Sequence, residues 1–569
     1  MKLLPQAIAG LVAHAVQAAQ AAGDLPAFDL PVFDIRPPKR PEQGDYAASV
    51  ALALAKTAGM PPLEIAKRIA KYLPPTDFVG SVDIAPPGYI NFRLSDTWLK
   101  QQVETIIAEG ESAFALDIGA GKRAQVEFVS ANPTGPLTVG RTRGGVIGDS
   151  TARVLEAAGY KVEREYYFNN AGRQMRNLGN SLRLRYLQAL GRTVELPDDD
   201  SFYQGKYLID FANDLVKERG DALADADWQP FKDYAEQHMF EWIKSSLARI
   251  QIRHDVFFNE NSLYESGAIW KVLEELQERG YVYKAVLPED ADPEDVADND
   301  SKDEAVWFRS TQFGDTKDRV LVKSSGEPTY TLPDIAYHAN KIERGFDLMV
   351  NILGSDHLVQ AQVVKYGLMA LGLDPSKVRV IINQMVLVMQ DGKPVRGSTR
   401  RAIFDTLDDL IDETSPDAVR YLMLARSPDS QHTFDLDLAV KQSNDNPVYY
   451  IQNAHVRCAG IFREAAARGV SDDGADVSLL SADELRFIRK ALELGEVIEV
   501  AARNLEAYRV AFYAQELAQT FHPIYDSVRA LHSEVPPELQ KARLRFYRAA
   551  QVVFKRVLTL MGMTAPDYM

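Results

Sequence analysis

The sequence has very little cysteine: Cys458 is the single one among 569 residues. This excludes an intramolecular disulfide framework and a cysteine-rich zinc site, and it fits a reducing compartment such as the cytoplasm. The chain also lacks any run of about 18 apolar residues, so we predict no membrane span. The N-terminal stretch, residues 1–23, is interrupted by Pro5 and His14. We therefore interpret it as an amphipathic helix and not as a signal peptide.

Basic residues are fewer than acidic residues: the sequence has 64 Lys and Arg against 80 Asp and Glu, and the net charge is −16. This balance argues against nucleic-acid binding, which needs lysine and arginine at phosphates. The charge is uneven, however. Residues 289–304 hold nine acids and one lysine, a pattern typical of a solvated loop. Residues 541–556 hold six basic residues, interleaved aromatics and no acid, which indicates either a solvated helix face or an RNA-binding helix.

Residues 129–149, "VSANPTGPLTVGRTRGGVIGD", lack the Gly-x-Gly-x-x-Gly fingerprint and the Gly-Lys-Ser/Thr of a Walker loop. They nevertheless place four glycines, Gly140, Gly144, Gly145 and Gly148, where a strand is predicted to turn into a helix. Such turns bring backbone N–H groups up to a phosphate.

The length predicts two to four domains. Residues 1–118 alternate helical patterns with a strand-like segment, "GYINFRL". From residue 119, the segments "RAQVEFVSANPTG", "GGVIGDSTARVLEAAGY" and "KVEREYYF" predict a strand–helix–strand unit, the start of a doubly wound parallel sheet. Helices are predicted within 171–280 and from about residue 443 onward. Further strands are predicted within 318–325, 346–353 and 377–388.

Six blocks of the sequence resemble the arginyl-tRNA synthetases, a family of class I aminoacyl-tRNA synthetases. They are "SANPTGPL", "REYYFNNAGRQM", "YTLPDIAYH", "TLDDLID", "FDLDLA" and "QSNDNPVYYIQNAH", and they occur in the family's order. The resemblance implies an α/β protein of three domains. These are an α+β N-terminal domain that contacts the tRNA elbow (1–118), a Rossmann-type doubly wound parallel-sheet catalytic domain with insertions (119–442), and an all-α anticodon-binding domain (443–569).

The resemblance also implies an ATP site. Class I synthetases carry a His-Ile-Gly-His-like motif at the first strand-to-helix turn, and here it is similar to Thr138-Val139-Gly140-Arg141. A side chain at Gly140 would obstruct the adenine ring. Both histidines are replaced, but Thr138 can donate a hydrogen bond and Arg141 offers a fixed forked charge. The alternative is that Arg141 is a structural surface residue. Further implied ATP contacts are Gly144, Asp356, Met385 and Val386.

The second class I signature, a Lys-Met-Ser-Lys-Ser-like loop, is similar to "GKPVRGSTRRAIF", residues 392–404. The resemblance implies catalytic roles for Arg396, Ser398 and Arg400, although Arg396 stands where lysine is usual. Departure of pyrophosphate needs cations near its oxygens and not lysine in particular. Some relatives carry a compensating lysine before the first motif, where this chain has Gly135. The alternative is a purely structural loop.

For the amino acid, a guanidinium requires carboxylates and an in-plane hydroxyl. The resemblance places such groups at Glu260, Tyr330 and Asp334, and the last two are four residues apart, so one helical turn can aim both at one ligand. Matches to other residues lining the same pocket are Glu127, Asn132 and Gln360. Pro333 departs from the small residues usual before this aspartate, and we expect it to alter the entry into the helix.

For tRNA, the resemblance implies that Tyr89 stacks on an unpaired base and that Asn91 hydrogen-bonds a base edge. The alternative is that Asn91 belongs to a core strand. Anticodon-side contacts are implied for Tyr450, Gln452 and the terminal Met569.

These inferences imply ATP-dependent ligation of L-arginine to tRNA(Arg) through an arginyl-adenylate, with release of AMP and pyrophosphate. Mg²⁺ is expected with the ATP, and no protein metal site is predicted. We expect a cytoplasmic monomer without membrane contact. One alternative is a catalytically impaired tRNA-binding or regulatory paralogue, since both signature motifs depart from the family. Another is a synthetase for a different amino acid, but Glu260 and Asp334 argue against a neutral substrate.

Overall fold

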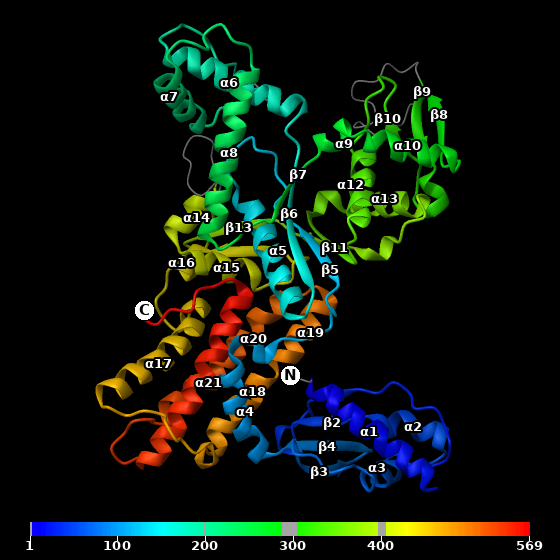
Figure 1. Ribbon diagram of the computed structural model, residues 1–569, viewed down its shortest axis with the longest axis vertical. Helices are drawn as coiled ribbons and strands as arrows, with labels where there is room; N and C mark the ends of the chain where they lie inside the picture. Colours follow the sequence, from blue (N-terminus) through cyan, green and yellow to red (C-terminus); the bar gives the residue numbers. More distant parts are fainter. Residues whose placement is uncertain (1–2, 198–200, 287–303, 396–405) are drawn as a thin grey trace.

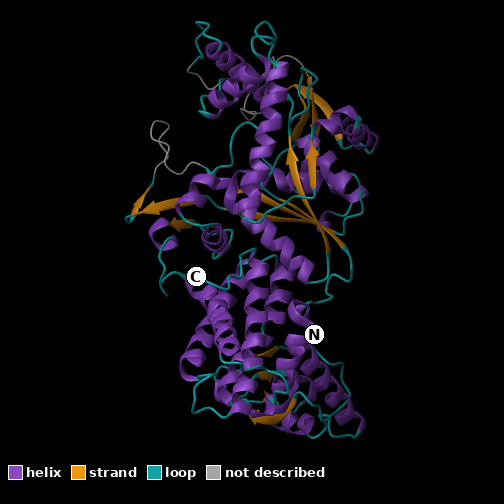
Figure 2. Cartoon of the chain, turned by 60° about the vertical axis from the view of Figure 1, so that its left-hand side comes forward, coloured by secondary structure: helices purple, strands orange, loops and turns teal. Residues whose placement is uncertain are grey.

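The computed structural model describes residues 3–197, 201–286, 304–395 and 406–569. The chain forms a small N-terminal region, a central α/β region and a C-terminal helical region. In the elongated molecule the C-terminal helical region lies between the other two (Figure 1). Figure 2 shows the strands of the central region above the helices of the C-terminal region, with the N-terminal region at the base. No helix of the described residues is both long and apolar enough to cross a membrane.

The N-terminal region packs helices on a small antiparallel sheet with the strand order β1-β2-β4-β3. Along the first helix, Ile8, Val12 and Val16 are buried at a spacing of four residues, which confirms the predicted amphipathic helix. The elements are α1 (Leu4–Ala21), β1 (Ile35–Arg36), β2 (Tyr46–Ala48), α2 (Val50–Ala58), α3 (Pro62–Ala70), β3 (Val79–Ala85) and β4 (Tyr89–Leu94).

The central region is built on a five-stranded sheet in the order β12-β11-β5-β6-β7, and every neighbouring pair is parallel. The strands are β5 (Arg123–Glu127), β6 (Lys161–Phe168), β7 (Val256–Asn259), β11 (Leu348–Gly354) and β12 (Val378–Asn383). The chain forms β5, β6 and β7 in one direction and then returns to place β11 on the other side of β5. The strand order therefore reverses between β5 and β11, as the predicted doubly wound topology requires. Ligands of such sheets bind at this reversal, beyond the carboxyl ends of the strands.

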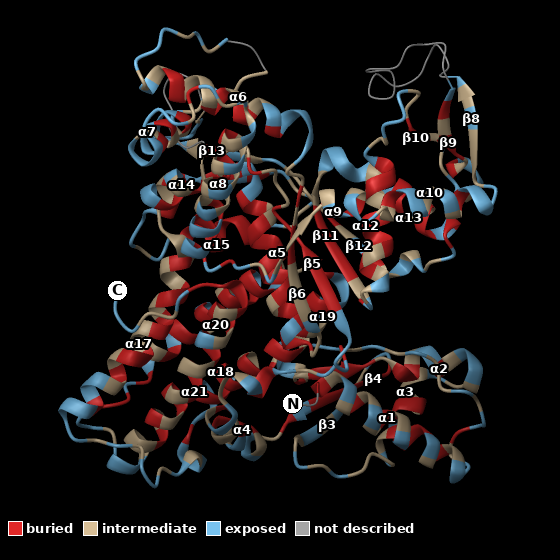
Figure 3. Ribbon diagram, turned by 45° about the horizontal axis from the view of Figure 1, so that its top comes forward, coloured by how far each residue is buried: buried red, intermediate tan, exposed pale blue. Residues whose placement is uncertain are grey.

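Helix α5 (Val139–Ala157) connects β5 to β6 and packs closely against the sheet. Gly148 leaves no room for a side chain, because a Cβ there would lie 2.3 Å from the ring of Phe128. Phe128 directly follows β5 and is buried, as are most residues of β5 and β11 (Figure 3). This contact fixes the middle of α5 against the residue that follows β5.

Two insertions interrupt the sheet order. The first lies between β6 and β7 and consists of α6 (Gly172–Ala189), α7 (Tyr207–Arg219) and α8 (Gln229–Arg249). The second lies between β7 and β11 and consists of α9 (Asn261–Glu265), α10 (Ala268–Glu278), β8 (Val282–Val286), β9 (Glu304–Phe308), β10 (Arg319–Val322) and α12 (Thr331–Glu343). Strands β8, β9 and β10 form a separate antiparallel sheet, so the strand predicted within 318–325 exists but does not belong to the parallel sheet. The acidic run, up to residue 303, lies outside the described residues.

The segment 377–388, predicted as strand, divides after β12. The N–H of Gln384 donates to the carbonyl of Pro428 at 3.0 Å, and the chain then leaves the parallel sheet. It continues as β13 (Val386–Gln390), which pairs with β14 (Lys393–Pro394) and β15 (His432–Asp435). The remaining helices of the central region are α13 (Leu358–Ala370), α14 (Leu407–Glu413), α15 (Pro416–Leu424) and α16 (Leu436–Ala439).

The C-terminal region is helical, as predicted. It comprises α17 (Pro447–Ala467), α18 (Ala482–Leu492), α19 (Leu494–Asn504), α20 (Tyr508–Ser527) and α21 (Pro537–Met561). Helix α4 (Asp96–Glu109), which follows the N-terminal sheet, packs against α18 and α21. The small N-terminal region is thereby attached to the helical region.

The basic segment 541–556 lies on α21, and its arginines form neither a solvated face nor a free RNA-binding face, because they pair with acidic side chains of the protein. Arg543 pairs with Glu484 at 3.1 Å, Arg548 pairs with Asp472 at 2.9 Å, and Arg545 pairs with Glu104 of α4. The aromatic residues of this segment are buried. These arginines therefore stabilise contacts within the protein, and their side chains are not presented to RNA.

Candidate active site

The turn after β5 is strained. Val129 and Ser130 have φ angles of 69° and 41°, in the left-handed region that a β-branched residue such as valine rarely adopts. The hydroxyl of Ser130 donates to Glu127 Oε1 at 3.0 Å and accepts from the N–H of Tyr167 at 3.2 Å. These bonds hold a turn that sends the chain from the end of β5 toward the start of α5.

The four residues that replace the first class I signature lie at the N-terminal end of α5. Thr138 precedes the helix with an exposed side chain, and its carbonyl accepts from the N–H of Arg141 at 3.0 Å. Arg141 is exposed, with one long contact of 3.5 Å from Nη1 to the carbonyl of Val129. A Cβ at Gly140 would meet only Thr138 Oγ1, at 3.9 Å. The protein itself therefore does not require glycine at 140, and the open space fits the predicted approach of a nucleotide.

Arg143, two residues further along α5, is buried and was not predicted as a site residue. Its guanidinium donates to the carbonyls of Gln384, Ser430 and Ser427 at 3.1, 3.0 and 2.9 Å. Burial lowers its pKa to about 10. Arg143 therefore fixes the segment just before Met385 against the start of α5. The sequence shows only an arginine beside a motif, and no spacing in it distinguishes Arg143 from Arg141.

The predicted nucleotide contacts surround this end of α5. Gly144 faces the ends of β11 and β12, because a Cβ there would lie 3.7 Å from both Ile352 and Asn383. Met385 is exposed and Val386 is half-buried, directly after β12. Asp356 is exposed in the turn after β11. Strands β5, β11 and β12 thus bring all of these predicted ATP residues to one edge of the sheet.

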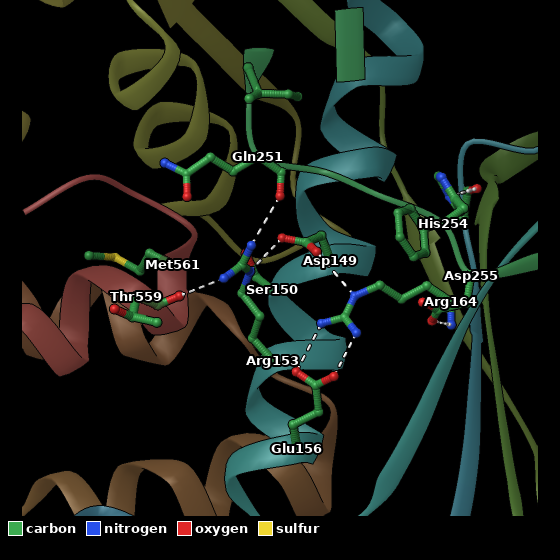
Figure 4. Close-up of polar contacts among 12 residues, drawn as sticks. Asp149, Ser150, Arg153, Glu156, Arg164, Gln251, His254, Asp255, Thr559 and Met561 are labelled. Carbon is green, nitrogen blue, oxygen red and sulfur yellow. Dashed lines mark hydrogen bonds and ion pairs between the residues drawn. The ribbon is translucent and has the colours of Figure 1, made fainter. Parts of the chain in front are cut away.

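Asp149 anchors the middle of α5 (Figure 4). Its buried carboxylate accepts from Arg153 at 2.7 Å and from Arg164 of β6 at 3.3 Å, and it pairs with Arg420 of α15 at 2.8 Å. Although burial opposes ionisation, the three arginines hold the pKa of Asp149 below its usual value. Arg153 also donates to the carbonyl of Thr559 at 3.2 Å, so the network reaches helix α21 of the C-terminal region.

The residues of the predicted arginine pocket lie at or just after the ends of β5, β6 and β7 and at the starts of α12 and α13. Glu260, which follows β7, accepts from the hydroxyl of Tyr167 at 2.6 Å and from Asn169 Nδ2 at 2.8 Å. Burial raises the pKa of Glu260. The pKa of Tyr167 is also raised, first by burial and then by the charges of Asp334, Glu260 and Glu127. Glu260 thus contacts Tyr167 directly, and the charges of Asp334 and Glu127 act on the same hydroxyl.

Asp334 lies in the first turn of α12. Gln360 Nε2 donates to Asp334 Oδ2 at 2.9 Å, so these two predicted residues are in direct contact. Burial raises the pKa of Asp334 to about 7 and outweighs the opposing hydrogen bond from Gln360, while Glu260 and Glu127 raise it further. Tyr330 caps the same helix, but its side chain is 83% exposed. Tyr330 is therefore not buried together with Asp334.

Pro333 does not disturb the entry into α12, contrary to our expectation. It lies in the first turn, where a backbone N–H has no partner within the helix. The N–H of Asp334 still donates to the carbonyl of Tyr330 at 3.2 Å.

Glu127 and Asn132 are close to the same pocket but already have partners. Glu127 Oε2 pairs with Lys341 Nζ at 2.7 Å. Asn132 Oδ1 accepts from the N–H of Asn169 at 2.9 Å, and its Nδ2 donates to Gln174 Oε1 at 2.9 Å. Sequence reasoning missed Tyr167, Asn169 and Lys341. The first two stand inside the block "REYYFNNAGRQM", so the family resemblance gave the available signal.

The predicted tRNA residues lie away from this site, in the N-terminal and C-terminal regions. In β4, Tyr89 is 38% exposed, whereas Asn91 is buried, as the core-strand alternative predicts. In α17, Tyr450 is half-buried against the ring of His522, with ring centroids 4.3 Å apart. Gln452 is buried and donates to Asp417 and to the carbonyl of Thr564. The terminal Met569 is exposed.

Arg396, Ser398 and Arg400 lie outside the described residues. Within the described residues, no group of three or more His, Cys, Asp or Glu side chains is arranged to hold a metal ion.

Three family descriptions match successive parts of the chain. "Arginyl tRNA synthetase N terminal domain" matches residues 6–94, "tRNA synthetases class I (R), catalytic domain" matches 102–435, and "DALR anticodon binding domain" matches 451–569. The catalytic match alone spans more than half of the chain.

Individual proteins agree with these matches. The chain is 42% identical over 543 residues to the arginine–tRNA ligase of Desulfotalea psychrophila, covering 94% of this chain and 95% of the relative. It is 41% identical over 581 residues to that of Carboxydothermus hydrogenoformans, covering 100% of both.

Among solved structures, a putative arginyl-tRNA synthetase from Campylobacter jejuni superposes with a TM-score of 0.74 at 30% identity, covering 84% of this chain and 100% of that one. The arginyl-tRNA synthetase of Thermus thermophilus superposes with a TM-score of 0.73 over 100% of both chains, and at 20% identity it shows the shared fold alone. From its sequence matches along the whole length, this chain belongs to the arginyl-tRNA synthetase family of class I aminoacyl-tRNA synthetases.

Proposed function

We propose that this chain ligates L-arginine to tRNA(Arg), using ATP to form an arginyl-adenylate and releasing AMP and pyrophosphate. The observation that carries the proposal is the position of three carboxylates: Glu127 ends β5, Glu260 follows β7 and accepts from Tyr167 of β6, and Asp334 lies in the first turn of α12. A guanidinium is permanently charged and forked, so carboxylates in a buried pocket are its natural partners. Membership of the family supports the same substrate.

In the first step, a carboxylate oxygen of arginine attacks the α-phosphate of ATP, and the bond from that phosphorus to pyrophosphate breaks. Glu260 and Asp334 hold the guanidinium, and Tyr330 closes the mouth of the pocket. Asn132 and Gln360 hold the backbone end of the amino acid, and Glu127 lines the floor. No covalent bond to the protein forms, so these residues act by positioning the reacting groups.

The N-terminal end of α5 lies beside this pocket and supplies the phosphate-binding part. Its free N–H groups favour an anion, and Thr138 and Arg141 are exposed at that end. We assign the adenine side to Gly140, Gly144, Met385 and Val386, with Asp356 nearby. Negative charge that develops on the phosphates is met by Arg141 and by the segment that contains Arg396, Ser398 and Arg400.

In the second step, a hydroxyl of the terminal ribose of tRNA attacks the carbonyl carbon of the adenylate, and AMP leaves. Tyr89, Tyr450 and Met569 are the proposed tRNA contacts, and the buried Asn91 and Gln452 support the segments that carry them. Of these side chains, Tyr89 and Met569 are exposed and accessible without rearrangement. Gln452 acts by holding the C-terminal tail, since it already binds the carbonyl of Thr564.

Mg²⁺ enters with the triphosphate of ATP. The described residues offer no cluster of protein ligands for it. We further propose that the enzyme is a monomer in the cytoplasm, where charged tRNA is used.

The test is transfer of labelled arginine to purified tRNA by the full chain in the presence of ATP and Mg²⁺. We expect arginine-dependent charging, with labelled lysine and citrulline as the matched controls that keep the charge or the shape but not both. Citrulline lacks the charge and leaves buried carboxylates unpaired, so it should be rejected strongly. If micromolar enzyme binds tRNA but transfers no arginine, the chain is a tRNA-binding paralogue and our proposal is wrong.

A further inference from the structure

Lys341 is a buried lysine in α12 that no part of the reaction described above uses. Its side chain has no exposed surface, and burying an ammonium group is costly unless every proton finds a partner. Nζ pairs with Glu127 Oε2 at 2.7 Å, donates to Asn351 Oδ1 at 3.0 Å, and lies 4.1 Å from the centroid of the Tyr337 ring. The ammonium group is therefore fully satisfied by strands β5 and β11 and by its own helix.

A chain of hydrogen bonds leads from Lys341 back to Asp334. Asn351 Nδ2 contacts His338 Nε2 at 2.6 Å, and His338 Nδ1 contacts the carbonyl of Asp334 at 2.8 Å. Since Lys341 can only donate, Asn351 must turn its oxygen to the lysine and its amide to the imidazole. His338 then accepts at Nε2 and donates from Nδ1. Burial, and the charge of Lys341 next, lower the pKa of His338 to about 3, so the imidazole is neutral, as this chain requires.

The aromatic contacts provide a second connection to the pocket. The ring of Tyr337 lies 4.5 Å from that of Tyr167, centroid to centroid. Tyr167 in turn donates its hydroxyl to Glu260. Lys341 thus contacts Glu127 directly, and reaches Asp334 and Glu260 through side chains packed against it.

We propose that Lys341 is a positioning residue of the arginine pocket: it holds Glu127 at the pocket floor and, through Asn351 and His338, the turn of α12 that carries Asp334. The inference rests on the proposed function, because it assumes that this pocket binds arginine. The same inference states which carboxylates balance the charge of the bound arginine. Glu127 is neutralised by Lys341, which leaves Glu260 and Asp334 to balance the guanidinium.

The first variant is Lys341→Met, which keeps the length of the side chain and removes its charge. We expect the arginine KM to rise by about tenfold or more while the ATP KM changes by less than about twofold, since the ATP residues lie beyond the turn after β5. The control is Arg543→Met. Arg543 of α21 pairs with the buried Glu484 at 3.1 Å in the C-terminal region, so this variant also leaves a buried carboxylate without its charge partner. Arg543→Met should lower the unfolding midpoint without a comparable rise in the arginine KM.

The pH profile separates positioning from a general loss of stability. The groups that face Asp334 are Glu260, Glu127, Lys341 and Gln360, and among them Lys341 supplies the positive charge that favours the ionised carboxyl. In Lys341→Met, the pH at which the arginine KM improves should therefore move upward. A merely structural lysine would leave that midpoint where it is in the wild type.

Lys341→Met leaves Glu127 buried and unpaired, so a second variant guards against misfolding. Asn351→Leu interrupts the hydrogen bonds between Lys341 and His338 at a neutral residue. It leaves the ion pair between Lys341 and Glu127 in place. It should raise the arginine KM in the same direction, by a smaller factor, and again spare the ATP KM. If both folded variants keep the wild-type arginine KM and pH midpoint, Lys341 is only structural and the inference is overturned. Failure of the wild type to charge tRNA would instead overturn the proposed function, so the two failures are distinguishable.

Discussion

Arg141 and Arg143 lie two residues apart at the start of α5, and their guanidinium groups are in opposite environments. Arg143 is buried and donates to three backbone carbonyls, whereas Arg141 is exposed with one contact of 3.5 Å. Residues two apart on a helix point in different directions, so one can support the fold while the other faces a ligand. This division leaves Arg141 free to replace the charge that the missing signature histidines would supply.

The first prediction concerns Arg141. If its charge acts as negative charge grows on the phosphates, Arg141→Ala should reduce the turnover of adenylate formation by about tenfold to a thousandfold, the scale of one electrostatic donor, with a smaller rise in the ATP KM. Arg141→Lys should recover part of the loss, because a point charge survives without the planar fork. Pyrophosphate exchange measures this step.

Restoring histidine at both positions is the sharper comparison for this prediction. If the Thr138→His, Arg141→His double variant matches the wild type while Arg141→Ala has no effect, Arg141 is a bystander. The phosphate charge would then fall to the segment that contains Arg396, Ser398 and Arg400.

The second prediction uses Asp334. Burial raises the pKa of its carboxyl to about 7, so binding of the cationic guanidinium should release a proton below that pH. Because the ionised carboxylate binds arginine better, the arginine KM should fall by about tenfold between pH 6 and pH 8, as linkage to one group requires. Asp334→Asn should flatten this dependence and weaken arginine use by about 2–4 kcal/mol, the range for a broken buried charged pair. Steady-state kinetics across this range would contradict the assignment if the variant kept the wild-type profile.

Asp149 gives the third prediction. Its three arginine partners lower its pKa, so the carboxylate stabilises the fold at neutral pH, and this stabilisation is lost as the pH falls through the lowered pKa. Asp149→Ala leaves Arg420 buried without its charge partner and should lower the free energy of unfolding by about 3–5 kcal/mol. The control is Glu499→Gln, which removes the partner of the exposed Arg503 and should cost at most about 1 kcal/mol. Chemical denaturation measures both, and equal costs would show that the network contributes nothing special.

The fourth prediction concerns the C-terminal tail. Arg463 donates to the carbonyl of Asp567 at 2.8 Å and lies over the ring of Tyr568, so the tail is held along α17 while Met569 stays exposed. Removal of Met569 alone should raise the tRNA KM and leave the ATP KM and the unfolding midpoint unchanged. Tyr450→Ala should have the same signature with a modest loss of stability, because Tyr450 packs on His522. An equal loss of ATP affinity would mean that the region supports the fold and does not contact tRNA.

The sequence by itself determined the family, the parallel doubly wound sheet and the helical C-terminal region. Local patterns account for this, since periodicity, turn glycines and blocks such as "YTLPDIAYH" are properties of short segments. Glu260 and Asp334 are 74 positions apart in the sequence, and only the family resemblance assigns both to one pocket, so their role as arginine ligands stays a prediction.

Only the tertiary structure decided which charged side chains already pair with other groups of the protein. Three arginines converge on Asp149 from three elements, Lys341 occupies Glu127, and Arg143 binds carbonyls more than 200 positions away. The sequence could not separate the paired arginines of α21 from an RNA-binding face, nor place β10 outside the parallel sheet. The physical reason is that burial and pairing set whether a charge is free to bind a ligand. Both depend on contacts between segments that are distant in sequence, which no local pattern encodes.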